Sequence, residues 1–269
     1  MICDFHTHTD FSGDCEAPAK AQIQRAIQLG MDEICITDHH DYDTAFCGVD
    51  FTLDLPAYIN AMDALKKEYA GQIRVGAGIE LGLQRHIEGH LEELSRTYLN
   101  RLDFVIGSNH FADGLDPYAA SYWEGRSVEE ALDRFFEVSL KRVQRLWPFF
   151  DVLGHLDYVI RYAPLKERAY RFKRYEEVIE AILRCLISRG KGLECNTGGL
   201  AYGLMEPNPA LQVLSRYREL GGEILTIGSD AHRPERLGFG FESCRQMLKA
   251  CGFRYYTVFH GRVPQFLPL

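Results

Sequence analysis

Residues 1–40, MICDFHTHTDFSGDCEAPAKAQIQRAIQLGMDEICITDHH, contain the pattern that decides the fold. The apolar run ICDFHTH, residues 2–8, is typical of a buried strand. Residues 18–30, PAKAQIQRAIQLG, predict a helix, because a proline stands in its first turn and a glycine at its end. The apolar run EICITD, residues 33–38, predicts a second strand, so the chain opens with a strand–helix–strand unit.

The same alternation of strands and helices continues along the rest of the chain. Further strands are expected over residues 73–81, 104–110, 150–157, 191–197, 223–232 and 254–260. Helices are expected over residues 56–71, 86–99, 127–147, 176–190, 208–222 and 241–252, and Ser127 with Glu130 predicts a capping box. Such alternation predicts parallel strands joined by helical crossovers. The number of units favours a barrel over an open sheet, formed by a single domain over residues 1–269.

Composition argues against several classes of protein. The 269 residues are 46% hydrophobic and 25% charged, which is ordinary for a globular fold. No stretch approaches the roughly 20 apolar residues of a membrane helix, and the first residues lack the pattern of a secretion signal. The net charge of −8 argues against a broad nucleic-acid surface. Eight cysteines without a C-x-x-C motif indicate reduced thiols, so we expect a cytoplasmic protein. From the apolar stretches and the net charge we expect no membrane partner and no nucleic-acid partner.

Imidazole, carboxylate and amide side chains recur where the expected strands end. They are His6, His8, Asp38, His39, His40, Glu80, Asn109, His110, His155, Asp230 and His232. In a barrel of parallel strands these ends meet at one rim, and residues two apart in a strand point to the same face. His6 and His8 are therefore expected side by side, able to chelate one cation. Because unpartnered buried polar groups cost free energy, a metal cluster explains this rim better than a polar core does.

Two other motifs are interpreted as structural. His86 and His90 lie four residues apart on an expected helix, but the glutamate between them is misplaced for H-E-x-x-H, so we interpret them as a surface pair. GAGIELG, residues 76–82, lacks the spacing of G-x-G-x-x-G, and we interpret its glycines as close-packing positions near Glu80.

The order of the strand-end motifs resembles that of the polymerase and histidinol phosphatase (PHP) family. FHTHTDFSGD, ITDH, GIE, GSNH, GHLD and GSDAH follow one another as in that family, and the matching motifs span residues 6 to 232. The resemblance implies an α/β fold, a distorted (β/α)7 barrel of the TIM type, with a metal cleft at the C-terminal ends of the strands. It also implies three divalent metal ions per chain, either manganese, iron or zinc.

Carried over motif by motif, the resemblance assigns nine metal ligands. The first metal ion would be held by His6, His8, Glu80 and Asp230, the second by Glu80, His110 and His155, and the third by Asp14, His39 and His232. Many family members have a histidine where Asp14 stands, and a carboxylate there is expected to favour manganese or iron over zinc. Asp38 is expected to support a ligand without binding metal itself, and the role of His40 stays open.

Within the family, the length and the local sequence resemble the stand-alone histidinol-phosphate phosphatases. The resemblance implies that a metal-bound hydroxide hydrolyses L-histidinol phosphate, a small phosphate monoester, to L-histidinol and phosphate. We expect Glu80, Asp230 and Arg161 to act in catalysis, Asp230 by moving a proton and Arg161 by binding phosphate. Arg161, Tyr118 and Asn109 are the expected substrate contacts. A solvated loop position for Arg161, and packing on the helices for the tyrosine, are the alternatives.

Three other functions are weighed against this one. Another PHP phosphoesterase would act on nucleotide 3′-phosphates or cyclic phosphodiesters. A non-catalytic metal-binding module is disfavoured, because every matched position carries a competent ligand. A metal-dependent amidohydrolase is disfavoured, since no strand end supplies a lysine that could bridge two metal ions. The sequence leaves undetermined the oligomeric state and the residues that select the amine and the imidazole of the substrate.

Overall fold

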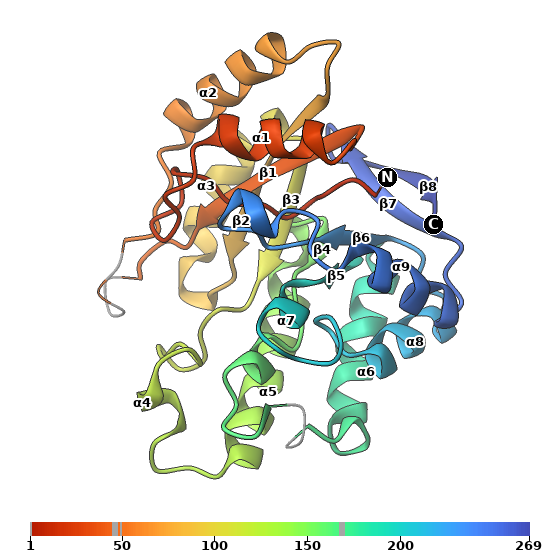
Figure 1. Ribbon diagram of the computed structural model, residues 1–269. Helices are drawn as coiled ribbons and strands as arrows, with labels where there is room; N and C mark the ends of the chain where they lie inside the picture. Colours follow the sequence, from red (N-terminus) through yellow and green to blue (C-terminus); the bar gives the residue numbers. More distant parts are fainter. Residues whose placement is uncertain (1, 45–47, 49, 167–169) are drawn as a thin grey trace.

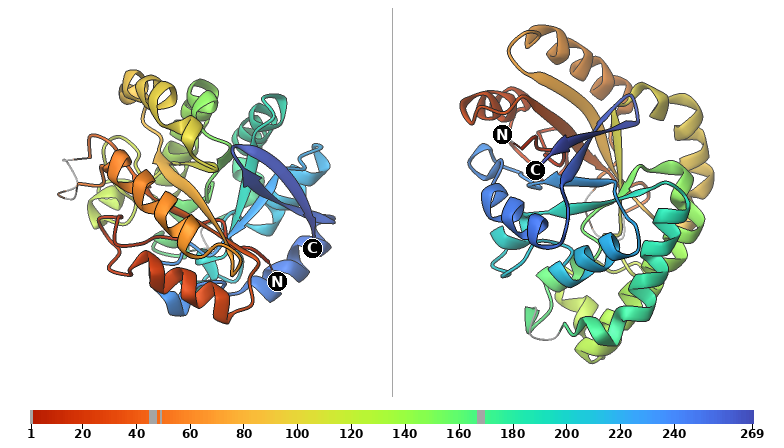
Figure 2. Two further views of the ribbon diagram at one scale, coloured as in Figure 1. Left: turned by 90° about the horizontal axis from the view of Figure 1, so that it is seen from above. Right: turned by 90° about the vertical axis from the view of Figure 1, so that its right-hand side faces the viewer.

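The fold is described by a computed structural model, which covers residues 2–44, 48, 50–166 and 170–269. Six strands form one parallel sheet, in which each strand pairs with the next along the chain. They are β1 (Glu33–His40), β2 (Arg74–Gly82), β3 (Phe104–Ser108), β4 (Val152–Leu153), β5 (Gly192–Asn196) and β6 (Leu225–Gly228). Figures 1 and 2 show this sheet curled, with helices on its outside. The α/β barrel-like architecture predicted from the sequence is therefore confirmed.

The N-terminal segment lies between the two edge strands of the sheet. Asp4 forms a parallel bridge with Ile34 of β1, and Thr7 forms one with Ala231, just after β6. The segment thus takes the seventh strand position of the predicted (β/α)7 barrel. Because its backbone bonds alternate between two neighbours, residues 2–8 form isolated bridges and not the continuous strand that the sequence predicts.

Helices follow the strands in chain order. They are α1 (Ala19–Gln28), α2 (Leu55–Glu68), α3 (Glu88–Thr97), α4 (Ala120–Trp123), α5 (Val128–Leu146), α6 (Phe172–Ser188), α7 (Gly198–Ala201), α8 (Leu211–Glu219) and α9 (Phe241–Ala250). The predicted capping box of Ser127 and Glu130 opens α5. α8 begins later than predicted, because Asn208 instead forms an antiparallel bridge with Asn196 of β5. None of the described helices has the length and apolar character that crossing a membrane requires.

A C-terminal hairpin covers one end of the barrel. It consists of β7 (Tyr255–His260), which packs against β6, and β8 (Val263–Pro268), which the sequence did not predict. Arg262 in its turn binds Asp151, which stands just before β4. His260 lies 2.9 Å from Glu33, the first residue of β1. Because both carboxylates stand at the N-terminal ends of their strands, the hairpin closes that end and leaves the C-terminal rim open.

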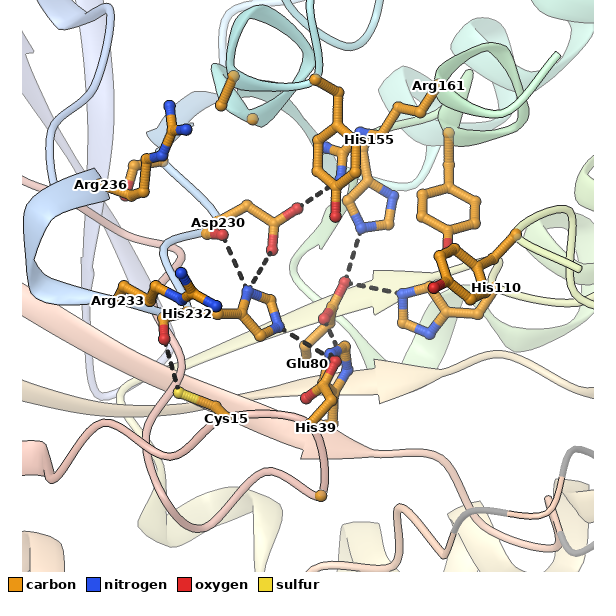
Figure 3. A pocket seen from close by; sticks show the side chains of 18 of the residues that line it. Cys15, His39, Glu80, His110, His155, Arg161, Asp230, His232, Arg233 and Arg236 are labelled. Atoms are coloured by element: carbon orange, nitrogen blue, oxygen red, sulfur yellow. Dashed lines mark hydrogen bonds and ion pairs between the residues drawn. The ribbon is translucent and has the colours of Figure 1, made fainter. Parts of the chain in front are cut away.

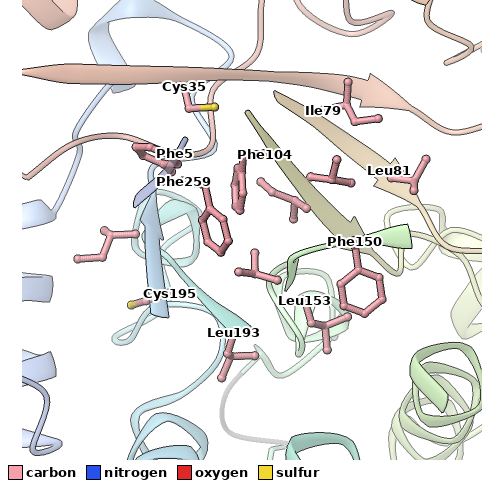
Figure 4. Packing of buried hydrophobic residues seen from close by; sticks show 14 of the residues in the cluster. Phe5, Cys35, Ile79, Leu81, Phe104, Phe150, Leu153, Leu193, Cys195 and Phe259 are labelled. Carbon is pink, nitrogen blue, oxygen red and sulfur yellow. The ribbon is translucent and has the colours of Figure 1, made fainter. Parts of the chain in front are cut away.

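Apolar side chains fill the space between the sheet and the hairpin (Figure 4). Phe104 of β3 lies between Phe5 and Phe259, with ring centroids 5.6 and 4.9 Å away, and all three side chains are at most 3% exposed. A buried aromatic ring removes about 150–250 Å² from water. This contact joins the N-terminal segment, the sheet and the hairpin, and so fixes the strand ends relative to one another.

Candidate metal centre

A cleft of about 1050 Å³ lies at the C-terminal ends of the strands. The predicted metal ligands that line it are Asp14, His39, Glu80, His110, His155, Asp230 and His232. The other two, His6 and His8, are fully buried and contact the carboxylates of Glu80 and Asp230 from behind. The structure thus gathers all nine predicted ligands, which come from separate segments of the chain. Figure 3 labels six of them, His39, Glu80, His110, His155, Asp230 and His232.

Glu80, near the end of β2, stands at the middle of this cluster (Figure 3). Its Oε1 lies 2.8 Å from Nε2 of His155 and 3.1 Å from Nε2 of His110. Its Oε2 lies 2.9 Å from Nδ1 of His39 without the alignment of a hydrogen bond, so it is a buried oxygen with no hydrogen-bond partner among the described residues. Burial raises the pKa of Glu80, but the imidazoles, that of His6 foremost, reverse this effect and hold the pKa well below its usual value.

Two carboxylate oxygens lie close to the same two imidazole nitrogens between the N-terminal segment, β2 and the end of β6. Nε2 of His6 and Nε2 of His8 are 3.1 Å apart. Oε2 of Glu80 and Oδ1 of Asp230 each lie 3.3–3.6 Å from these two nitrogens. The ligand atoms of His6, His8 and Asp230 all lie within 4.8 Å of one another, and so do those of His6, Glu80 and His155, which is close enough for either group to share one cation. The donor set therefore fits a divalent metal ion.

A further donor group lies on the side of the cleft formed by the loop after the N-terminal segment. Oδ2 of Asp14 is 3.3 Å from Nε2 of His232 and 3.7 Å from Nε2 of His39. Asp230, which precedes His232 by two residues, has a left-handed backbone with φ of +57°. Such a conformation is strained for a residue other than glycine, and strained residues of this kind cluster at functional sites.

Several imidazoles are oriented by a partner on their other ring nitrogen, as is usual for metal ligands. Nδ1 of His6 lies 2.5 Å from Oε1 of Glu194 in β5, and Nδ1 of His110 lies 3.0 Å from Oδ1 of Asp41. Neither carboxylate was predicted from the sequence. The available signal for Glu194 was an acidic residue within an otherwise apolar predicted strand.

Asp38 contacts a predicted ligand through one intermediate, as expected. It accepts a hydrogen bond from Oγ of Ser12 at 2.7 Å, and this Oγ lies 3.1 Å from Nδ1 of His8. His40 belongs to a different environment, because its Nδ1 accepts from the amide of Leu53 and its Nε2 lies 3.0 Å from Nε2 of His90.

The two histidines interpreted as a surface pair have separate partners. His86 is exposed and its Nε2 lies 3.0 Å from Oδ2 of Asp43. His90 contacts His40 and stacks on the ring of Tyr42 at 3.8 Å. Neither histidine is among the described residues that line the cleft.

Arg161 is a buried residue and not the solvated loop arginine that the sequence also allowed. Its guanidinium donates from Nη1 to Oδ2 of Asp230 at 2.7 Å, from Nε to Oδ1 of Asn208 at 2.8 Å and from Nη2 to Oδ1 of Asn196 at 2.8 Å. It lies between the rings of Tyr158 and Tyr202, and it lines the cleft. Arg161 therefore presents a fixed positive charge beside a predicted metal ligand.

The other two expected substrate contacts lie in different places. Tyr118 lines the cleft, is 73% exposed and contacts the edge of the Tyr162 ring. Asn109 is not among the described residues that line the cleft. Its side chain instead accepts a hydrogen bond from Nη1 of the buried Arg142 at 3.3 Å. Arg233 and Arg236, which the sequence did not single out, also line the cleft, and both side chains are exposed.

The protonation states of the imidazoles couple metal binding to pH. Burial lowers the pKa of His110, but Asp41 and Glu80 outweigh burial and raise the pKa to about 10. The pKa values of His6 and His39 are likewise raised well above the usual value, because carboxylates outweigh their burial. These rings therefore carry a proton at neutral pH when no metal ion competes for the nitrogen.

We expect metal binding to displace these protons. Titration of zinc into metal-free protein at pH 7, in two buffers of different ionisation enthalpy, should show release of at least one proton per protein. Since the proton competes with the metal ion, affinity should rise with pH, by about tenfold per pH unit for each proton released. Equal heats in the two buffers, and an affinity that does not change between pH 6 and pH 8, would contradict this expectation.

Comparison with known proteins places this geometry in a family. The family model of the PHP domain matches residues 4–198. A histidinol-phosphatase of Lactococcus lactis subsp. lactis is 30% identical, over 96% of this chain and 94% of its own. A Thermotoga maritima protein named "Probable histidinol-phosphatase" is 31% identical, over 96% and 95% of the two chains.

Structural comparison gives the same result. The crystal structure of the histidinol phosphate phosphatase of Lactococcus lactis, complexed with zinc, L-histidinol and phosphate, aligns with a TM-score of 0.88 at 30% identity and covers 98% of each chain. The predicted family is thus confirmed by sequence and by fold, and this chain belongs to the PHP domain family.

Proposed function

We propose that this protein is a metal-dependent phosphomonoesterase that hydrolyses L-histidinol phosphate to L-histidinol and phosphate. The observation that carries the proposal is the buried carboxylate of Glu80 among imidazoles, in the same cleft as the buried guanidinium of Arg161. Cation-binding donors and a fixed arginine on one surface suit the dianionic group of a phosphate ester. Relatives named histidinol-phosphatase, one of them bound to L-histidinol and phosphate, support this choice of substrate.

We propose that three divalent metal ions, of manganese, iron or zinc, are held by the three predicted ligand groups. The converging donors of the first group, and the zinc in the Lactococcus lactis relative, support metal binding at this cleft. Bound metal ions would make an attacking water more acidic and would offset negative charge on the phosphate oxygens. The carboxylate of Asp14 in the third group favours a harder ion there.

We propose that Arg161 and Asp230 act on the substrate together. An arginine has five N–H donors, and three of those of Arg161 are engaged by Asp230, Asn208 and Asn196. The two that remain can bind phosphate oxygens in the cleft. Burial raises the pKa of Asp230, but the positive charges of His6 and Arg161 reverse this and hold it well below its usual value. Asp230 is therefore ionised and can accept a proton from water and return it to the leaving alkoxide.

We further propose a single domain over residues 1–269 that works in the cytoplasm without a nucleic-acid partner. The seven cysteines of the described residues are all free thiols, as is usual in a reducing compartment. The net charge of −8 supports a small-molecule substrate over a polyanion.

Phosphate release from L-histidinol phosphate tests the proposed function. With manganese or zinc added, kcat/KM for this ester should exceed that for a nucleotide 3′-phosphate and for an aryl phosphate by at least about a hundredfold, or about 2.7 kcal/mol. The same protein treated with a chelator serves as the control and should be inactive. Turnover of the nucleotide alone would indicate a different PHP phosphoesterase. Stoichiometric metal without turnover of any ester would indicate a non-catalytic module.

A further inference from the structure

A buried carboxylate that forms no direct ion pair with a described residue lies behind Arg161. Asp157 follows β4 in the GHLD motif and is 1% exposed. Its Oδ1 accepts a hydrogen bond from Nδ2 of Asn208 at 2.6 Å, and its Oδ2 accepts one from the amide of Ala210 at 2.9 Å. No lysine, arginine or histidine of the described residues lies within ion-pair distance of it, and the positive charge of Arg161 acts on it only from further away. Burying an unpaired carboxylate costs free energy, so this position requires a reason.

The contact with Asn208 supplies that reason. The side-chain amide of Asn208 faces two ways, since its Nδ2 donates to Asp157 while its Oδ1 accepts from Nε of Arg161 at 2.8 Å. A carboxylate can only accept hydrogen bonds, whereas an amide can turn and exchange its donor for its acceptor. Asp157 therefore allows one orientation of the Asn208 amide, which is the orientation that offers an acceptor to Arg161.

We propose that Asp157 is a positioning residue that fixes the guanidinium of Arg161 through Asn208. Asn208 is the partner of Nε, while Asp230 and Asn196 hold Nη1 and Nη2. With all three nitrogens held, the two remaining N–H donors have fixed directions into the cleft. The consequence for phosphate binding rests on the proposed function, whereas the effect on the orientation of Arg161 does not.

Asp157→Asn tests the chain of contacts. The new amide must still accept from the main-chain amide of Ala210, which cannot turn, so its NH2 group faces Asn208. The Asn208 amide then turns, and its NH2 group confronts Nε–H of Arg161. We expect KM for the phosphate ester and the inhibition constant of inorganic phosphate to rise at least about tenfold, with a smaller change in kcat and unchanged metal content.

A charge exchange provides the decisive comparison. Asn208→Asp alone puts two carboxylates at the 2.6 Å contact and should cause a loss like that of Asp157→Asn. The double variant Asp157→Asn with Asn208→Asp restores a donor opposite an acceptor at every contact, so it should recover to within about threefold of the original protein. Asp32→Asn, at an exposed position just before β1 and away from the cleft, is the matched control and should change nothing.

Nuclear magnetic resonance of the arginine Nε–H groups gives a reading that does not need turnover. The Nε–H of Arg161 should be protected from exchange in the original protein, lose protection in Asp157→Asn and regain it in the double variant. Loss of activity with unchanged protection, or a double variant no better than either single one, would overturn the proposal. If a single variant does not fold, the test rests on the double variant, which must fold and show a protected Nε–H of Arg161. A double variant that does not fold, or that lacks this protection, also overturns the proposal. An original protein that shows this protection but cleaves no phosphate ester contradicts only the proposed function.

Discussion

Replacing Glu80 by glutamine is expected to lower kcat/KM by at least about a thousandfold, or about 4 kcal/mol of transition-state stabilisation. The change keeps the shape of the side chain but removes a buried negative charge that lies within 3.3 Å of nitrogens of His155, His110, His39 and His6. The imidazoles that are protonated in the metal-free protein would then repel one another without compensation, and a bound cation would lose a negatively charged neighbour. Metal content should fall together with turnover.

The Glu80 variant is compared with Glu92→Gln, on the exposed face of α3, which should keep metal content and kcat/KM within about twofold of the original protein. Metal content is measured by mass spectrometry and turnover by phosphate release. A glutamine at position 80 with full metal content and undiminished turnover would remove Glu80 from the metal centre.

Gly228→Ala is expected to damage the fold and the metal centre together. A Cβ atom at Gly228 would lie 2.2 Å from Cβ of His6 and 2.7 Å from Oε1 of Glu194. Neither neighbour can yield easily, because one Cβ is fixed to the N-terminal backbone and Glu194 is fully buried. We expect the free energy of unfolding to fall by about 3 kcal/mol and metal to be lost, because His6 must move.

Gly89→Ala is the matched control, since a Cβ at this position on α3 meets nothing within 4 Å. It should stabilise the protein by about 0.5–1 kcal/mol, because alanine is the better helix former. Denaturant unfolding and metal content measured on both variants decide the matter. Equal free energies of unfolding for the two variants would contradict the prediction, because they would show that the backbone at Gly228 can move away from His6 without loss of stability.

The sequence predicted the parts of the site that depend on local pattern. Strand ends were visible as apolar runs that finish in histidine or acid, and the rule that parallel strands end at one rim brought Glu80, His110 and His155 together. The partners Glu194 and Asp41 were missed, because their contacts depend on the spacing between neighbouring strands. The pattern of residues within one segment does not reveal how far its side chains lie from those of a neighbouring strand.

Arg161 and Asn109 also show that contacts between distant segments could not be predicted from the sequence. Asn109 stands at the end of one predicted strand and Arg161 shortly after another, so the sequence treated them alike as substrate contacts. The structure buries Arg161 against two asparagines and Asp230, while Asn109 binds Arg142 from α5. Which neighbour a polar side chain meets was decided by helices and loops far away in the chain. The hairpin strand β8 was missed because its two prolines suit an edge strand but weaken the sequence signal.

The position of the N-terminal segment also has a consequence for how the protein matures. Asp4 accepts a hydrogen bond from the amide of Ser229, which is 225 residues later in the chain. During translation, His6 and His8 therefore emerge more than 220 residues before Asp230 and His232. Contacts at such separation are slow to form. The metal centre can thus be completed only after the segment that carries Asp230 and His232 has left the ribosome, so we expect metal loading to follow the synthesis of that segment.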